Sequence, residues 1–420
     1  MTAIVGVLNK HALAIAADSA ETIGDGTKIY NKANKIFTLS KYKPVGIAIY
    51  DSAAFNELIP WEIIIKMYRS QLGNKSFDHV VDYADDFLKY LDRYRIDNLV
   101  ASDYDSVICG FLHSVYNVEI LGKLPNSDAA LGIIDNKDIG QFTTLLAQIK
   151  SASIASGKHP LLSHVLLADF IPIISDLCKV INSQVTQAGG DYSGIETLVQ
   201  ETFFELYTSN HLLYRNKTGL AFIGYGEKEI YPTIHRIEVH DCILNKLVLN
   251  DIETVSVSNS ITASIRPMAQ TDVMMTYITG INPMFEKLIK ELTFNTVNNV
   301  LDTIKTLAAK DPTLASAIGA VDLTPFMKQY SKDIDDIKLR DAISPLMNTV
   351  ASMEKEDLAE LAENLIYLTS LKRRITSDKE SVGGPVDVAI ISKGDGFIWL
   401  KRKHYFNPEL NRCFFEKYYE

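Results

Sequence analysis

The chain has 420 residues and a mass of 46.9 kDa, with 47% hydrophobic and 22% charged residues. This composition is typical of a folded globular protein and excludes a disordered or collagen-like chain. The 42 basic and 52 acidic residues give a net charge of −10, which argues against a general binder of nucleic acid or of anionic membranes. No apolar run approaches the ~20 residues of a membrane-spanning helix.

The cysteines and the first residues bear on the cellular compartment. Four cysteines are spread along the chain without a C-x-x-C pair, which is too sparse for a disulfide scaffold or a four-cysteine zinc site. The first residues lack the basic segment and the apolar core of a secretory signal. We therefore expect a cytoplasmic protein that contacts neither nucleic acid nor membrane and holds no metal or other cofactor.

The first fifty residues have the pattern of β-strands. Apolar runs at 3–8 and 12–17 are separated by turn residues, and two further runs follow at 35–39 and 45–50. The alanine-rich run 12–17 would also suit a helix, but its six residues between turn signals favour a buried strand. A polar, glycine-bearing loop is expected over 22–27.

Helical spacing begins after residue 53 and alternates with strands from there to the end. Apolar residues recur three and four apart over 55–72 and 77–94, and less regular helical segments are predicted within 96–216. Strands are predicted at 219–225, 233–239, 242–249, 386–392 and 397–402, and helices at 283–307 and from about 354 to 374. This order predicts an α+β fold and not a regular βαβ alternation.

Thr2 is the first candidate for chemistry. Once Met1 is removed, which is favoured before a small residue, Thr2 would carry a hydroxyl nucleophile beside its own α-amino group. An α-amine titrates at about pH 8 and can therefore act as a general base at neutral pH. The alternative is that Thr2 only begins an edge strand.

The context of Thr2 supports the catalytic interpretation. The motifs that carry it read Thr2–Val7, Ala16–Ser19, Asn34–Ile36, Val45–Ala53, Ala221–Gly226 with Pro232–Ile237, and Asp378–Gly384, and the resemblance built on them extends over about half of the chain. In this order they resemble the proteasome β subunits and the HslV-type threonine peptidases, which are N-terminal nucleophile (Ntn) hydrolases.

The resemblance implies a fold and a domain organisation. The fold would be a four-layer αββα Ntn-hydrolase sandwich in a single domain over 1–420. Its core segments would lie at about 1–95, 217–297 and 353–420, with helical insertions at about 96–216 and 298–352.

The resemblance also implies roles for individual residues. Thr2 would be the nucleophile, Lys35 would lie against its hydroxyl, and Asp18 would keep that lysine charged and oriented. The spacing to Lys35 is one residue longer than usual in the family, so Lys32 is a competitor. The N–H of Tyr50, where the family usually has glycine, would hold the oxyanion.

Two more residues are assigned near the C-terminus. Asp378 and Ser381 would bond to the N-terminal amine, although Val382 is an extra residue before the family's glycine pair. The family's additional serine has no clear match, and Thr262, Ser264 and Thr271 stay open as candidates.

The sequence therefore predicts a proteasome-like threonine hydrolase that cleaves peptide or amide bonds through an acyl-enzyme on Thr2. Two alternatives stay open, a non-catalytic scaffold and a small-molecule amidase or acylase of the same fold. We further expect a homo-oligomer, and the sequence identifies no particular unfoldase or other protein partner. Signals for other chemistry are weak: Gly224-x-Gly226 lacks a third glycine, and His235 and His240 lack a partner carboxylate at diagnostic spacing.

Overall fold

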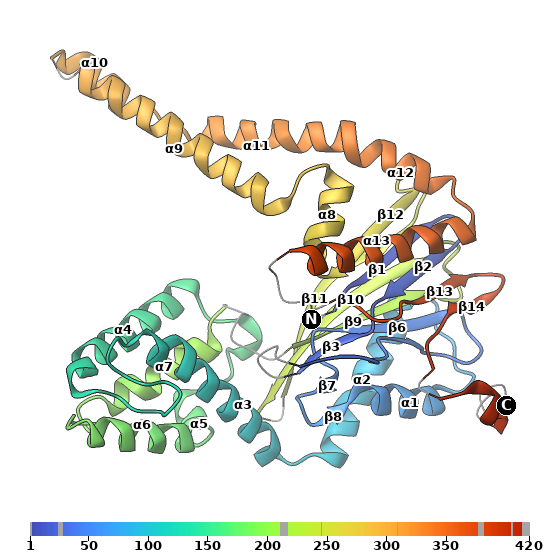
Figure 1. Cartoon of the computed structure of the whole chain (residues 1–420), viewed down its shortest axis with the longest axis horizontal. Coiled ribbons are helices and arrows are strands. Elements are labelled where there is room, and N and C mark those ends of the chain that lie inside the picture. Colours follow the sequence, from blue (N-terminus) through green and yellow to red (C-terminus); the bar gives the residue numbers. More distant parts are fainter. Residues whose placement is uncertain are drawn as a thin grey trace.

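The core of the protein is a pair of five-stranded antiparallel sheets, seen in a computed structural model that describes residues 2–23, 28–210, 217–244, 246–308, 310–376, 382–404 and 406–413 (Figure 1). The first sheet has, in spatial order, β12 (Ala263–Ala269), β1 (Ile4–Asn9), β2 (Leu13–Ala17), β13 (Asp387–Ser392) and β14 (Gly396–Lys401). The second sheet has β11 (Lys246–Ser256), β10 (Thr233–Ile243), β9 (Lys217–Gly224), β6 (Val45–Tyr50) and β5 (Ile36–Thr38). The predicted α+β class is thereby confirmed.

The two sheets pack face to face through one buried apolar cluster. Ile4 and Leu8 of β1 belong to it together with Ala221 and Ile223 of β9. The sheets approach closely at Gly6, where an added Cβ would lie 2.7 Å from Cδ1 of Ile234. The alanines of β2 are buried on both faces of the first sheet, which explains why this run forms a strand despite its helical composition.

Helices cover the outer face of each sheet. Against the second sheet lie α1 (Trp61–Leu72) and α2 (Val80–Asn98), whose buried residues share a cluster with the outward side of β6 and β9. Against the first sheet lie α8 (Thr271–Thr279), α12 (Ser344–Ala351) and α13 (Lys355–Ile375). The layers thus run helix, sheet, sheet, helix. Acidic residues in the first turn of α13 and basic residues in its last turn complement the helix dipole, as the sequence predicts.

Several boundaries differ from the predictions. The strand predicted at 242–249 is wrong in its start, because β10 continues to Ile243 and the turn comes at Leu244, whose φ is 48°. Strand β12 was not predicted, since Arg266 and Pro267 interrupt its apolar pattern. The loop expected over 22–27 is wrong at its start, because residues 22 and 23 belong to strand β3 (Ala20–Ile23), which pairs with β4 (Lys28–Asn31); residues 24–27 lie outside the described residues.

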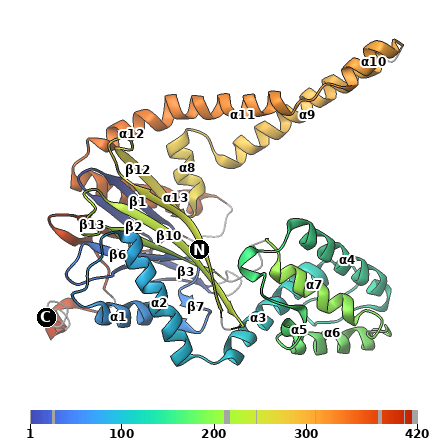
Figure 2. The ribbon, with the colours of Figure 1, turned by 180° about the vertical axis from the view of Figure 1, so that it is seen from behind.

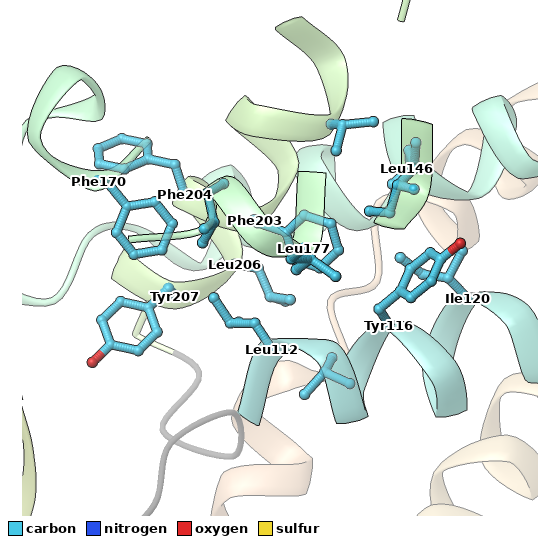
Figure 3. Packing of buried hydrophobic residues seen from close by; sticks show 14 of the residues in the cluster. Leu112, Tyr116, Ile120, Leu146, Phe170, Leu177, Phe203, Phe204, Leu206 and Tyr207 are labelled. Atoms are coloured by element: carbon cyan, nitrogen blue, oxygen red, sulfur yellow. The ribbon is translucent and has the colours of Figure 1, made fainter. Parts of the chain in front are cut away.

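The chain between α2 and β9 forms a helical lobe with its own core. Its helices are α3 (Ala101–Val115), α4 (Ile139–Ser156), α5 (Leu167–Phe170), α6 (Ser175–Gln187) and α7 (Glu196–Thr208). Figure 3 shows the aromatic and aliphatic side chains that these helices bury against one another, among them Tyr116, Phe203 and Tyr207. Ile243 and Val248, at the tip of the β10–β11 hairpin, belong to the same cluster, so the lobe is anchored on the second sheet.

A second helical segment projects from the first sheet's side as an arm. It consists of α9 (Pro283–Ala308), α10 (Pro312–Gly319) and α11 (Thr324–Lys338). In both ribbon views α9 runs out to a tip at α10, away from the sandwich and from the helical lobe, and α11 leads back towards α12 (Figures 1 and 2). Of the helices in the described part of the chain, none combines the length and apolar character needed to cross a membrane.

Candidate functional site

Thr2 lies at the start of β1 and is held against the end of β2. The residue is 8% exposed. The N–H of Ala3 donates to Oδ1 of Asp18 at 2.8 Å, and the N–H of Asp18 donates back to the carbonyl of Ala3 at 3.1 Å. This reciprocal pair fixes the peptide bond that joins Thr2 to Ala3.

The buried ammonium of Lys35 lies at the same carboxylate. Its Nζ donates to Oδ1 of Asp18 at 2.6 Å and to the carbonyl of Ala20 at 2.6 Å. Lys35 is 5% exposed, whereas Lys32 is exposed. The structure therefore brings Lys35, and not Lys32, to Asp18.

The second carboxylate oxygen of Asp18 is also fully used. It accepts from the N–H of Ala20 at 3.1 Å and from the N–H of Gly383 at 3.2 Å. Four donors therefore satisfy a carboxylate that is 1% exposed, which offsets the cost of burying its charge.

The contact with Gly383 ties the C-terminal part of the chain to the site. The N–H of Ser19 donates to the carbonyl of Gly383 at 3.1 Å, and Oγ of Ser370 in α13 donates to the carbonyl of Val382 at 3.2 Å. Asp378 and Ser381 lie outside the described residues, so their predicted roles stay predictions.

Tyr50 ends β6 beside this site, but its N–H faces the neighbouring strand. The N–H of Ile49 donates to the carbonyl of Lys35 at 2.8 Å, on the β5 side of β6. Because successive amides of a strand point to opposite sides, the N–H of Tyr50 points towards β9, where Tyr50 pairs with Gly219. An N–H that points into the sheet is not available to an oxyanion, which conflicts with the role predicted for the N–H of Tyr50.

The side chain of Tyr50 fills the space between the sheets. Its ring lies in the same buried cluster as Ile4 and Ala17, and its hydroxyl accepts from Nε of Arg236 at 3.2 Å and from Nη2 at 3.1 Å. Burial raises the pKa of the Tyr50 hydroxyl, while the Arg236 guanidinium partly opposes that rise. The Tyr50 hydroxyl therefore stays protonated, and the ring packs between the two sheets.

Asp51, the next residue, has an unusual backbone. Its φ is 70°, in the left-handed region that favours glycine and costs other residues about 1 kcal/mol or more. Within the described ranges, no acceptor is found for its N–H. This amide follows two positions after the strand contact with Lys35, so the described structure leaves one backbone donor unused at this end of β6.

A charged cluster continues from this point along the inner face of the second sheet. Nζ of Lys217 lies 2.8 Å from Oε1 of Glu238 and 4.0 Å from Oδ2 of Asp51, and Nε2 of His240 lies 3.5 Å from Oε2 of Glu238. Although burial raises the pKa of the Glu238 carboxyl, its contacts with His240 and Lys217 outweigh burial and lower this pKa to about 2. Glu238 is therefore ionised at neutral pH.

Two of the candidates for the additional serine lie at different distances from Thr2. Ser264 pairs with Leu8, six residues along the strand from Thr2 and so roughly 20 Å away, which excludes it as a partner of Thr2. Thr271 follows shortly after Ala269, which pairs with Ile4, and therefore lies at the same end of the sheet as Thr2. Across the described ranges, no group of three or more side chains is arranged to hold a metal ion.

Sequence reasoning missed three contributors to this site. The carbonyl of Ala20 and the N–H of Gly383 act through the backbone, and no residue type signals such a role. Asp51 could have been found from its position directly after a buried strand, where the resemblance places a turn. Its conformation, however, is visible only in the structure.

The comparisons with known proteins are distant. No protein-family model matches the chain, and no curated protein matches it. Among solved structures, a mutant of Anbu from Hyphomicrobium sp. strain MC1 is 8% identical, with 99% of this chain and 94% of that chain covered and a TM-score of 0.29. Anbu (ancestral beta-subunit) from Yersinia bercovieri is 9% identical, with 99% and 93% covered and a TM-score of 0.29.

These findings correct the family identification made from the sequence. The solved structures reported above are Anbu proteins, not the proteasome β subunits or HslV-type peptidases that the segments resemble, and a TM-score of 0.29 carries no argument about fold or activity. Membership of the Ntn hydrolase superfamily is therefore withdrawn. The antiparallel two-sheet architecture and the contacts around Asp18 rest on the structure itself.

Proposed function

We propose that the protein hydrolyses amide bonds with Thr2 as its nucleophile, after an aminopeptidase has removed Met1. One observation carries the proposal: the ammonium of Lys35 and the amide of the Thr2–Ala3 peptide bond are bound to the same oxygen of Asp18. A buried ammonium beside an N-terminal threonine favours the negative charge that develops on the attacking oxygen.

The reaction has two halves. In the first, the hydroxyl oxygen of Thr2 attacks the substrate carbonyl while the α-amine of Thr2 takes the hydroxyl proton. The tetrahedral adduct then expels the leaving amine, which receives that proton, and an ester to Thr2 remains. In the second, water attacks the ester, gives a proton to the α-amine and releases the acid, which regenerates the free hydroxyl and amine.

The neighbouring residues have separate roles in this scheme. Lys35 stabilises charge on the Thr2 oxygen, and Asp18 is a positioning residue that holds both Lys35 and the start of β1. The N–H of Asp51 takes the oxyanion role in place of Tyr50, since it has no acceptor within the described part of the chain. Tyr50 supports this turn by packing its ring between the sheets.

Intact mass and N-terminal sequencing of the purified protein, together with turnover of a panel of peptide amides, test the proposal. We expect the chain to begin at Thr2 and to hydrolyse at least part of the panel, and Thr2→Ala to lose that activity. A chain that retains Met1 would block the amine and contradict the mechanism. A chain that begins at Thr2 but is inactive on every peptide and small amide would favour the non-catalytic scaffold.

A further inference from the structure

The arm formed by α9, α10 and α11 has almost no buried interior. Helix α9 buries only Ala308, α11 buries no residue, and none of the four buried apolar clusters in the described structure includes a residue of 283–338. The seam between the two long helices is joined by polar contacts: Nζ of Lys338 donates to Glu286 at 2.9 Å, and the hydroxyl oxygens of Thr293 and Tyr330 lie 3.3 Å apart. Because helices in proteins are stabilised mainly by tertiary packing, the arm needs a further surface to pack against.

An apolar stripe on α9 faces away from this polar seam. Phe285 is 66% exposed, Leu292 64% and Leu307 77%. At 3.6 residues per turn these three lie within about 40° of Thr296 around the helix axis, whereas Lys290 lies about 120° away. The stripe is therefore one face of α9, with Thr296 and Thr303 between its apolar side chains, and nothing in the described chain covers it.

Part of the stripe reads the same from both ends. The positions that mirror one another about Thr296 are apolar in three pairs: Phe285 with Leu307, Leu288 with Ile304, and Leu292 with Val300. When two identical helices cross antiparallel about a two-fold axis, each residue meets its mirror position on the other helix. The stripe is thus complementary to a second copy of itself.

The charge of the arm also suits self-association. Residues 283–338 contain seven lysines and eight acidic residues, which is close to neutral, whereas the whole chain carries −10. Lys287 and Lys305 fall at mirror positions, but each already has an acidic neighbour on its own helix, Glu291 at 3.8 Å and Asp302 at 3.0 Å. Two arms can therefore approach without the repulsion that the rest of the chain would impose.

We propose that the arm is a dimerisation element in which the α9 stripes of two copies pack antiparallel, with Thr296 at the two-fold axis. The four long helices of two arms then enclose the apolar core that one arm lacks. This inference is independent of the activity proposed for Thr2.

The first test is the mass of the full-length protein in solution, measured by analytical ultracentrifugation between about 1 and 50 µM. Leu292→Glu places a carboxylate in the stripe, so we expect it to lower the mass of the wild-type particle twofold. Asn298→Glu adds the same group on the other side of α9, about 160° from Thr296 around the helix axis, and should leave the mass unchanged. Circular dichroism should show equal helix content in both variants.

The second test fixes the arrangement of the two helices. In a Cys413→Ser background, Thr296→Cys should form a covalent dimer under mild oxidation, because the mirror geometry places the introduced thiols of the two copies beside one another. Phe285→Cys alone should not, but a mixture of Phe285→Cys and Leu307→Cys proteins should cross-link. A monomeric wild type, a mass unaffected by Leu292→Glu, or self-cross-linking of Phe285→Cys in place of Thr296→Cys would each overturn the proposal.

Discussion

The ring of Tyr50 lies directly over the backbone of Gly219. The two residues pair across β6 and β9, and a Cβ added to Gly219 would lie 2.0 Å from the ring. No real Cβ approaches an aromatic carbon so closely, so Gly219 is required by the space that Tyr50 occupies and not by its backbone conformation. The pair fixes the end of β6, and with it the turn at Asp51.

This relationship predicts a non-additive pair of substitutions. Gly219→Ala should destabilise the protein by about 3 kcal/mol, because the Tyr50 ring must leave its place between the sheets. In a Tyr50→Ala background the same change should cost well under half as much. Urea unfolding of the four proteins of the double-mutant cycle measures the coupling, and equal costs in both backgrounds would show that the two residues act separately.

Lys35→Ala should abolish turnover while the protein remains folded. The backbone donors of Ala3, Ala20 and Gly383 still satisfy Asp18, but the loss of the buried partner should cost about 3 kcal/mol of stability. Lys35→Arg should also be inactive, because a planar guanidinium cannot replace a compact ammonium in this space. The exposed Lys32→Ala is the control and should retain full activity; near wild-type hydrolysis by Lys35→Ala would rule out the assigned role.

Substitutions at Asp51 should distinguish the role of its backbone N–H from the role of its carboxylate. Asp51→Gly keeps the N–H and relieves the strain of a φ of 70°, so we expect activity to persist and stability to change by no more than about 1 kcal/mol. Asp51→Val should lose about 2 kcal/mol and most activity, because a β-branched residue is strongly disfavoured in that region. Thermal unfolding and turnover check both, and an inactive Asp51→Gly would point to the carboxylate instead.

The pKa of Glu238 predicts a pH-dependent contribution to stability. Its folded pKa of about 2 is below the ordinary value of 4.5, so ionised Glu238 stabilises the fold above about pH 4.5 and this contribution is lost as the pH falls towards 2. Glu238→Gln should therefore be less stable than wild type by about 2 kcal/mol at pH 7. The difference should shrink by pH 3 in urea titrations, and a constant difference at both pH values would contradict the low pKa.

Local sequence patterns were sufficient for most strands of the core, although not for β12. The runs that became β1, β2 and β6 are apolar and bounded by turn residues, and the α+β class follows from their order. The pairing of Asp18 with Lys35 was predicted only through the family resemblance, and the structure shows this ion pair.

The remaining features depend on tertiary structure. Whether the N–H of Tyr50 is available depends on its register with Gly219, which no local pattern contains. The carboxylate of Asp18 also binds Gly383, more than 360 residues away in sequence. The exposed apolar stripe of α9 has the same periodicity as a core-facing helix, so only the structure shows that the described chain leaves it uncovered.

The most direct test of the account is covalent labelling of Thr2. A β-lactone or an epoxyketone probe should add to the N-terminal peptide of the wild-type protein, the epoxyketone through both the hydroxyl and the free amine. Thr2→Ser should keep partial labelling, and Thr2→Ala should lose it while unfolding at a similar temperature, because a strand terminus contributes little packing. Mass spectrometry of the labelled peptides identifies the modified residue, and the account predicts an adduct on Thr2 alone. Labelling that persists in Thr2→Ala would contradict it, and Ser381 would then be the first position to check.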